Sequence, residues 1–306
     1  MKILITGSSG FIAYHLIKQL CGMHELHCVD RNDYKSKRMD ELKQPNHNIN
    51  FYTDELKSFD IIRQINPDII IHLAAESGVS NSFNNPSYVL KHNTDTFLNV
   101  IEGIRNINPK IKLIYASSSS VYGNTTKDHT ENNDELCPMS AYALSKLMNE
   151  QTAQLYFNNY DIKSIGLRFF TVYGEYNRKD MLVGLLLDAF SSGGDINLYN
   201  GGNMSRSFTY VGDVSNIIGI FVDEISSFER HDIFNVGGES VSLSRVYESF
   251  EKNFTTRPNL INAICPRYSP INTVCDNRKL LTYFDDLKFV NIDDGIKKLC
   301  DHYKCN

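Results

Sequence analysis

The chain has 306 residues, a formal net charge of −5 and a sequence pI near 6.0. Hydrophobic residues make up 42% and charged residues 22%, which is ordinary for a soluble globular protein long enough to bury a full core. The sequence has no basic stripe and no apolar run of about 18 residues, which argues against a nucleic-acid partner and against a membrane span.

The cysteines and the N-terminal residues predict a cytoplasmic protein without a metal site. The seven cysteines are odd in number and form no CxxC pair, which argues against a disulfide framework and against metal ligation. We expect reduced thiols, as in the cytoplasm. Residues 1–20 also lack the charged start, the long apolar stretch and the cleavage site of a signal peptide.

Short apolar runs alternate with helical patterns through the first half of the chain. In chain order we expect a strand at 2–6, a helix at 11–20, strands at 26–29 and 49–52, a helix at 56–65, a strand at 68–74, a helix at 86–108, a strand at 111–116, a helix at 141–158 and a strand at 164–169. The run at 68–74 is continuously apolar, as in a strand buried on both faces. This alternation predicts an α/β fold with a parallel sheet built from right-handed βαβ units.

The pattern changes after residue 174. Loops lengthen there, and glycine pairs occur at 193–194, 201–202 and 237–238. We therefore expect a first domain at 1–173 and a smaller lobe of mixed helices and short strands at 174–306. Because no long linker separates them, the chain is expected to cross between the two lobes more than once.

The stretch GSSGFIA at 7–13 lies between the first strand and the first helix. Gly7 would allow a tight turn, and Gly10 would let the backbone approach a pyrophosphate at the helix N-terminus. Ala13 stands where a third glycine is common and adds only a methyl group. Asp30 ends the second strand, where a carboxylate can bind a ribose diol and favour NAD over NADP. The alternatives are a structural turn and a solvated acid.

A second motif combines YASSSSVYG at 115–123 with YALSK at 142–146. Tyr142 and Lys146 are four residues apart, so on a helix they share one face. A nearby ammonium lowers the pKa of a tyrosine, which is otherwise about 10. With a serine from the preceding strand end to orient an alcohol, the pair could take a proton from a carbinol as hydride leaves for a nicotinamide. The alternative is a tyrosine and a lysine exposed on a helix.

These motifs, with HLAAESGVS at 72–80 and RFFTVYG at 168–174, resemble the extended short-chain dehydrogenases/reductases over nearly the whole chain. The resemblance is closest to nucleotide-sugar epimerases and, among them, to UDP-glucuronate 4-epimerases. The latter rests on LRFFTVYG, NRKDM and INLYNGGNMSRSFTYVGDV at 167–174, 177–181 and 196–214. It implies a Rossmann-type doubly wound parallel sheet with a smaller C-terminal mixed α/β substrate-binding lobe.

The resemblance implies roles for three sets of residues and no metal. The catalytic residues would be Ser118, Tyr142 and Lys146. The NAD site would be lined by Gly7, Gly10, Phe11, Ile12, Asp30, Asp54, Leu73, Ala74, Ala75, Tyr142 and Lys146. The nucleotide sugar would be bound by Ser118, Ser119, Ser120, Thr171, Arg178, Arg206 and Arg267. Within that set, the serines and Thr171 would receive a sugar carboxylate and Arg206 the diphosphate.

The implied activity is redox-neutral interconversion of UDP-glucuronate and UDP-galacturonate through a 4-keto sugar. Tyr142 would take the proton of the C4 hydroxyl while NAD takes the hydride. The resemblance also implies a homodimer through the helices at 86–105 and 142–158, although packing on the sheet would explain their apolar faces equally well. The product is expected to serve polysaccharide biosynthesis.

Several alternatives share this fold. A nucleotide-sugar 4-dehydrogenase or 4-reductase would stop at ketone or alcohol, and an epimerase of a neutral UDP-hexose could use the same serines for a hydroxymethyl group. A non-catalytic NAD-binding protein usually loses the tyrosine or the lysine, and both are present. A 4,6-dehydratase is disfavoured because Ser119 and Ser120 replace its Asp-Glu pair. Glu76 follows HLAA where the family usually has an uncharged residue, and its orientation is open.

Overall fold

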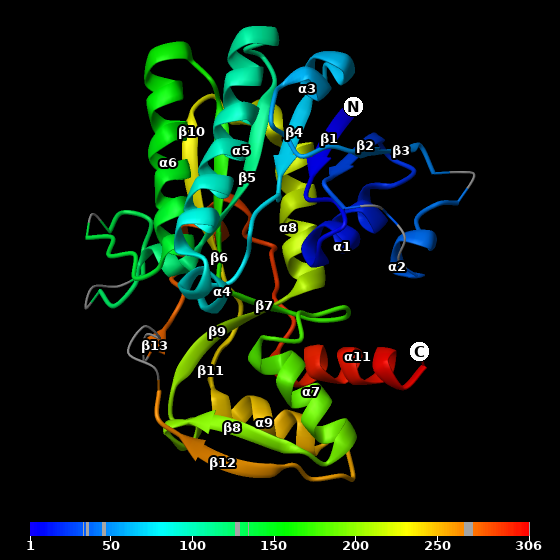
Figure 1. Ribbon diagram of the computed structural model, residues 1–306, viewed down its shortest axis with the longest axis vertical. Helices are drawn as coiled ribbons and strands as arrows, with labels where there is room; N and C mark the ends of the chain where they lie inside the picture. The colour runs from blue at the N-terminus through cyan, green and yellow to red at the C-terminus, as the bar shows by residue number, and fades with distance from the viewer. Residues whose placement is uncertain are drawn as a thin grey trace. The chain divides into compact units, whose positions relative to one another are not determined.

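The computed structural model describes residues 1–32, 34, 37–44, 47–125, 129–133, 135–265 and 272–305 (Figure 1). The chain forms two compact units, each built from three segments. The first unit contains Met1–Gly123, Leu136–Arg168 and Ser215–Phe234. The second contains Asn124–Glu135, Phe169–Val214 and Asn235–Asn306. The division differs from a single boundary at residue 173, because the segment Ser215–Phe234 returns to the first unit.

A seven-stranded sheet forms the centre of the first unit. Its strands are β1 (Lys2–Thr6), β2 (Glu25–Asp30), β3 (Ile49–Thr53), β4 (Ile69–His72), β5 (Lys112–Ser118), β6 (Ser164–Phe169) and β10 (His231–Val236). Their order is β10-β6-β5-β4-β1-β2-β3, and the pairs β1–β2, β1–β4, β2–β3 and β4–β5 are parallel. Starting from β1, the chain first adds β2 and β3 on one side and then β4, β5 and β6 on the other. Doubly wound sheets bind ligands at this switch point, between β1 and β4.

The helices of the first unit lie between these strands in the chain. They are α1 (Phe11–Leu20), α2 (Lys37–Asp40), α3 (Asp60–Ile65), α4 (Val79–Asn84), α5 (Pro86–Ile107), α6 (Ala141–Tyr160) and most of α8 (Val211–Asp223), with 3₁₀ turns η1 (Ser119–Val121) and η3 (Ile225–Ser227). α5 and α6 pack side by side (Figure 1). Pro86 starts α5, since its fixed φ suits a first helical turn, and α5 ends before Pro109.

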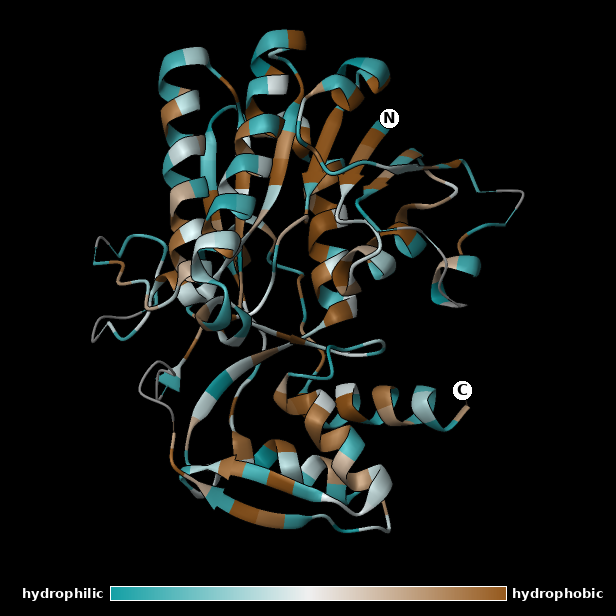
Figure 2. Cartoon of the chain, in the orientation of Figure 1, coloured by the Kyte–Doolittle hydropathy of each residue, from teal (hydrophilic) through white to brown (hydrophobic). Residues whose placement is uncertain are grey.

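Burial of apolar side chains accounts for the position of the sheet. All four residues of β4 are buried, and β1 and β4 are brown along most of their length in Figure 2. Leu4 and Ile70 from the sheet pack with Phe97, Val100 and Ile104 of α5 in one core cluster. Burying such a side chain contributes about 1.5–3 kcal/mol relative to leaving it exposed. The apolar stripe of α5 therefore fixes that helix against the sheet.

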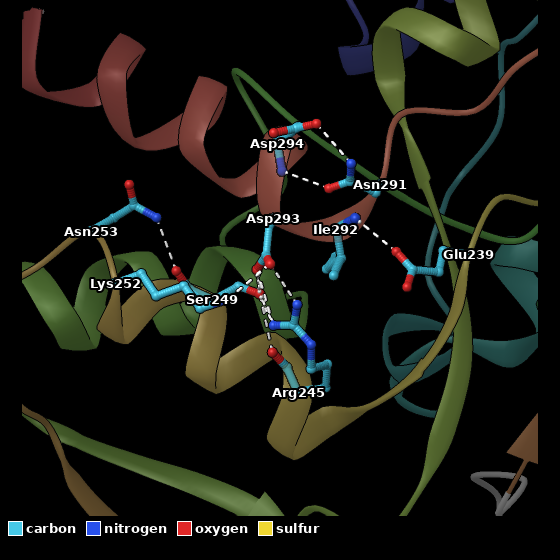
Figure 3. Close-up of polar contacts among 9 residues, drawn as sticks. All are labelled: Glu239, Arg245, Ser249, Lys252, Asn253, Asn291, Ile292, Asp293 and Asp294. Carbon is cyan, nitrogen blue, oxygen red and sulfur yellow. Dashed lines mark hydrogen bonds and ion pairs between the residues drawn. The ribbon is translucent and has the colours of Figure 1, made fainter.

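The second unit is smaller and mixed. Its strands are β7 (Thr171–Tyr173), β8 (Asp195–Tyr199), β9 (Ser205–Tyr210), β11 (Ser240–Ser242), β12 (Asn259–Ala263) and β13 (Asn272–Thr273). Its helices are α7 (Leu182–Ser192), α9 (Leu243–Glu251), α10 (Arg278–Tyr283) and α11 (Ile292–Cys305), with the 3₁₀ turn η2 (Asn200–Gly202). β9 pairs with β7, β11 and β13, and β8 pairs with β12. Polar contacts between Arg245 of α9 and Asp293 of α11 join two of the helices (Figure 3).

The predicted fold class is confirmed, and each strand expected in the first half is present with ends shifted by a few residues. The helix expected at 56–65 begins only at Asp60, because Leu56 has a φ of 54° and cannot extend a right-handed helix. The strand expected at 68–74 ends at His72. Among the described residues, no helix is both long and apolar enough to span a bilayer.

Candidate active site

The loop between β1 and α1 packs closely against the chain after β4. Gly7 has a φ of 67°, and a Cβ at this position would lie 2.6 Å from the backbone nitrogen of Ala74. Gly10 is the N-cap of α1, and a Cβ there would lie 2.9 Å from the Gly7 oxygen. Gly10 provides no side chain to cap the N–H groups of the first turn, which begins with Phe11 and Ile12. Such a turn can bind a pyrophosphate through its backbone.

The Asp30 carboxylate lies next to this loop and is held by the backbone. The N–H of Ser9 donates to Oδ2 at 3.0 Å, and the N–H of Asn32 donates to Oδ1 at 2.9 Å. Asp54, after β3, donates its N–H to the Asp30 carbonyl at 2.9 Å. Because Asp30 is only 8% exposed, the geometry disfavours a solvated acid at a strand end. Each carboxylate oxygen keeps a lone pair for a further donor, as binding of a ribose diol requires.

The orientation of Glu76 is that of an ion-pair partner. Its Oε1 lies 2.5 Å from Nη2 of Arg31, and Nη1 of Arg31 donates to the Tyr88 hydroxyl at 2.9 Å. The N–H of Glu76 donates to Oδ1 of Asn93 at 2.7 Å. The charge of Glu76 is therefore compensated by the cation that follows Asp30.

The remaining residues predicted to line the NAD site follow β4. Leu73 donates its N–H to the Thr6 carbonyl at 3.2 Å, Ala74 donates its N–H to Oγ1 of Thr6 at 3.3 Å, and Ala75 comes next in the chain. These residues and those after β1, β2 and β3 follow the carboxyl ends of neighbouring parallel strands. The structure thus brings the residues predicted after these four strands to one edge of the sheet.

Residues 117–122 form what we call the serine turn. Ser118 ends β5 and is 9% exposed, and Ser119 to Val121 form η1. Oγ of Ser118 accepts the Ser120 N–H at 3.1 Å and the Ser120 hydroxyl at 2.8 Å. The turn therefore gathers the three predicted serines directly after a buried strand.

Tyr142 and Lys146 lie on one face of α6, as predicted. The helix begins at Ala141, and Oγ of Ser140 caps it by accepting the Ala143 N–H at 3.1 Å. Nζ of Lys146 lies 5.8 Å from the centre of the Tyr142 ring. The same Nζ donates to the carbonyl of Ala116, in β5, at 2.8 Å.

The surroundings of Lys146 shift the pKa of its amine. The side chain is buried, and burial lowers the pKa of Lys146 to about 8, against the opposing effect of the Glu150 carboxylate. At pH 7 the amine still carries its proton for most of the time. Since α6 packs against both β5 and η1, the same helix places Lys146 and Tyr142 next to the serine turn.

Two buried charges near these residues were not predicted. Arg168 in β6 and Glu150 in α6 form an ion pair whose side chains are 3% and 1% exposed. The signal was present in the sequence, because an arginine inside an apolar strand requires a buried partner. The partner itself could not be chosen from the sequence alone.

The other predicted substrate residues belong to the second unit. Thr171 begins β7, and Arg206 lies on β9, where burial lowers the pKa of its guanidinium. Arg178 contacts Asp180 through two bonds, Nε to Oδ1 at 3.0 Å and Nη2 to Oδ2 at 2.5 Å. Arg267 lies outside the described residues. The predicted site residues are thus divided between the two units.

Comparison with known proteins identifies the family. The sequence pattern of the NAD dependent epimerase/dehydratase family matches residues 3–237. The chain belongs to this family. The resemblance predicted from the sequence, the NAD cofactor and the enzyme class of an NAD-dependent epimerase are confirmed.

Two relatives of this epimerase match over nearly their whole lengths. The chain is 35% identical to "Protein CapI" of Staphylococcus aureus, covering 99% of this chain and 98% of the relative. It is 31% identical to the "Probable UDP-glucuronate 4-epimerase" of Rhizobium meliloti, covering 100% and 98%. A solved UDP-glucuronic acid 4-epimerase from Bacillus cereus, in complex with UDP-glucuronic acid and NAD, is 26% identical, with a TM-score of 0.91 and coverage of 100% and 99%.

The residues of this epimerase at the sheet edge fit NAD. Gly7 leaves the space that a Cβ would fill, and the fixed Asp30 carboxylate can accept from a ribose. The buried ammonium of Lys146 donates to the Ala116 carbonyl near the carboxyl end of β5, at the sheet edge that a nicotinamide half would reach. Among the described residues, no group of three or more His, Cys, Asp or Glu side chains could hold a metal ion.

Proposed function

We propose that the chain is a nucleotide-sugar 4-epimerase that interconverts UDP-glucuronate and UDP-galacturonate. The observation that carries the proposal is the full-length likeness to the Bacillus cereus enzyme solved with UDP-glucuronic acid and NAD. The whole-length relative from Rhizobium meliloti supports the same activity.

In this proposal the proton transfers belong to Tyr142. The chemistry that NAD supplies when bound is reversible hydride transfer at C4 of the sugar. The Tyr142 phenolate accepts the C4 hydroxyl proton as the 4-keto sugar forms and returns it after the sugar has presented its other face. The Lys146 ammonium, 5.8 Å from the ring centre, favours the phenolate, and Ser118 orients the hydroxyl.

The serine turn would recognise the acid group at C6. Ser118 and Ser119 offer hydroxyl donors, and Ser118 already accepts two bonds from Ser120, so its own proton is free to point at a ligand. Ser120 would have to turn its hydroxyl away from Ser118 to donate as well. Hydroxyl donors bind a carboxylate at a smaller desolvation cost than a buried cation would impose. Thr171 is proposed to add a further donor from the second unit.

Arginines of the second unit would anchor the nucleotide. Arg206 is the second residue of β9, a strand that pairs with three others, and a guanidinium suits a diphosphate because its planar fork donates two parallel bonds. Arg178 is paired with Asp180 and would have to exchange that partner for an anionic ligand. Arg267 is proposed as a further phosphate or ribose contact on the resemblance alone.

The decisive experiment is incubation of the purified chain with catalytic NAD and, separately, UDP-glucuronate, UDP-glucose and UDP-N-acetylglucosamine. Proton NMR would follow the configuration at C4. Conversion of the acid alone supports the proposal and the serine turn as its carboxylate receiver. Conversion of a neutral sugar instead would overturn the substrate assignment, and accumulation of NADH without an epimer would indicate a 4-dehydrogenase.

We also propose that the chain acts as a cytoplasmic homodimer that supplies a polysaccharide precursor. Four leucine or methionine side chains on α5 and α6 are about two-fifths exposed or more, namely Leu98, Leu144, Met148 and Leu155. A second copy covering both helices would bury them. Met148→Lys combined with Leu155→Lys should shift the sedimentation coefficient to that of a monomer. Leu185→Lys on α7, equally exposed, is the matched control and should change nothing.

A further inference from the structure

We propose that the buried Glu150–Arg168 ion pair is a positioning element that fixes the serine turn at both ends and aligns it with Tyr142 and Lys146. The inference rests on the proposed function, because it assigns the serine turn a role in orienting the sugar. Neither Glu150 nor Arg168 touches substrate in this proposal.

The two ends of the serine turn are bound to opposite members of the pair. At the first end, the Ser117 hydroxyl donates to Oε1 of Glu150 at 2.5 Å. At the last end, Nη1 of Arg168 donates to the Tyr122 hydroxyl at 2.8 Å, and the guanidinium carbon lies 4.8 Å from the centre of the Tyr122 ring. Ser117 and Tyr122 are both buried. The turn can therefore move at neither end without breaking a buried charged contact.

The ion pair itself is rigid. Nε of Arg168 donates to Oε1 of Glu150 at 2.9 Å, and Nη2 donates to Oε2 at 2.8 Å, which is the parallel two-bond geometry of a guanidinium and a carboxylate. The guanidinium thus uses three of its five N–H groups on Glu150 and Tyr122. Glu150 comes from α6, Arg168 from β6 and Tyr122 from the position directly after η1, so the pair joins three segments around one point.

The same contacts align the serine turn with α6. Lys146 and Glu150 are one helical turn apart, and they bind consecutive residues of β5, the carbonyl of Ala116 and the hydroxyl of Ser117. Two anchors on one helix face and two adjacent positions on one strand fix the register of α6 against β5. That register sets where Ser118 lies relative to Tyr142.

Stability alone does not account for such a pair. Well-packed apolar residues of similar volume often stabilise a core as well as a buried ion pair does. An ion pair differs in offering directional bonds, and here four of them run to or between groups around the site. A positional misfit of about 1 Å at a reacting group can cost about a hundredfold in rate. The geometry therefore assigns the pair to alignment of the site.

The test compares two buried serines. Ser117→Ala removes the bond to Glu150 but leaves the ion pair intact. Ser164→Ala is the matched control, since Ser164 is equally buried and its hydroxyl lies 2.9 Å from Nδ1 of His231, in the same sheet but with no contact to the serine turn. Both substitutions delete one buried hydrogen bond. We expect a fall in Tm for both variants, the larger for Ser117→Ala because its bond is to a charged group.

The expected difference lies in catalysis. Ser117→Ala should lower kcat by about tenfold or more with KM for the UDP-sugar and Kd for NAD unchanged, because a bond to a charged group is lost and the turn is released. Ser164→Ala should leave kcat unchanged. Tyr122→Phe, which removes the contact at the other end without changing volume, should reproduce the effect of Ser117→Ala. Equal losses of kcat in Ser117→Ala and Ser164→Ala would overturn the proposal.

Hydrogen exchange provides a readout that needs no substrate. The N–H groups of Ser120, Tyr122 and Gly123 are bonded within the serine turn. Their exchange should accelerate in Ser117→Ala and Tyr122→Phe and stay unchanged in Ser164→Ala. If the wild-type chain turns over no UDP-sugar, the proposed function is wrong, while this exchange comparison still decides the role of the pair. Unchanged exchange in both serine-turn variants would refute it.

Discussion

Two arginine–carboxylate pairs, one in each unit, are each joined by two parallel hydrogen bonds but lie in different surroundings. Glu150 and Arg168 are 1% and 3% exposed, whereas Asp293 and Arg245 are 37% and 32% exposed. In the second pair Arg245 donates through both terminal nitrogens, at 2.9 and 2.5 Å (Figure 3). Water can replace a partner in the exposed pair but not in the buried one. The same contact therefore holds a site in the first unit and only joins two helices in the second.

The polar side chains of the two units also differ in how deeply they are buried. In the first unit Asp30, Ser118 and Lys146 are buried polar groups at one sheet edge and along one helix. In the second unit the network of Figure 3 joins α9 to α11 through the buried Ser249 and through Asp293 and Lys252, whose side chains are 37% and 57% exposed. We therefore expect substitutions of these groups to affect activity or stability strongly in the first unit and to have only a small effect on stability in the second.

The largest effect is expected at Tyr142, where a substitution should lower activity without lowering stability. Tyr142→Phe should lower kcat by about 10²- to 10⁴-fold, because the base that takes the C4 proton is lost. Tm and the affinity for NAD should stay within experimental error, as measured by thermal unfolding and by calorimetric titration with NAD. Tyr247→Phe, on α9 of the second unit, is the control. Retained turnover would remove Tyr142 as the base.

The next largest effect is expected at the buried pair and concerns stability. Glu150→Gln leaves the Arg168 charge buried without a counter-charge, which costs about 3–5 kcal/mol. Urea unfolding should show this loss, and the double variant Glu150→Gln/Arg168→Met should recover part of it because no unpaired charge remains. If Glu150→Gln costs no more than Asp293→Asn, burial does not distinguish the two pairs.

A smaller effect is expected for the cofactor. Asp30→Ala should weaken NAD binding by about ten- to hundredfold, since charged hydrogen bonds are worth about 1.5–3 kcal/mol, and should relax discrimination against NADP. Calorimetry with both dinucleotides measures this directly. Asp40→Ala, at a carboxylate that pairs with Lys43 on the surface, should leave both affinities unchanged. A variant of Asp30 that binds both dinucleotides like the wild type would exclude its ribose role.

The smallest effect is expected at Asp293 and depends on pH. Hydrogen bonds from Arg245 hold the pKa of the Asp293 carboxyl well below its usual range. A depressed pKa in the folded state means that the stabilisation is present above the unfolded value of about 3.9 and is lost as the pH falls below it. Asp293→Asn should thus lower stability by no more than about 1 kcal/mol at neutral pH, since the pair is partly exposed. The difference in Tm from wild type should shrink below about pH 4, and a difference that grew there would contradict this account.

The sheet could be predicted because its strands are locally apolar. The run at 69–72 is buried throughout, and the helix from Pro86 has both a start signal and a stop signal in the sequence. The break at Leu56 could not be predicted, since a positive φ in a leucine arises from its surroundings. The position of β10 in the sheet could not be predicted either, because strand order depends on contacts between distant segments.

The candidate site was predictable where its residues follow one another in a motif. The spacing of Tyr142 and Lys146 on one helix face, and the glycine turn at Gly7, follow from local sequence. The pairing of Glu76 with Arg31 does not, and neither does that of Glu150 with Arg168, because several partners of opposite charge were available along the chain. Tertiary structure alone selects among such partners.

The position of β10 has a consequence for biosynthesis. β10 completes the edge beside β6, yet β7, β8 and β9 are made between these two strands. All of β6 is buried in the finished sheet, so while the ribosome translates the intervening part its edge exposes unpaired backbone N–H and C=O groups beside apolar side chains. The nascent chain is therefore prone to aggregate until β10 has been translated and has paired with β6.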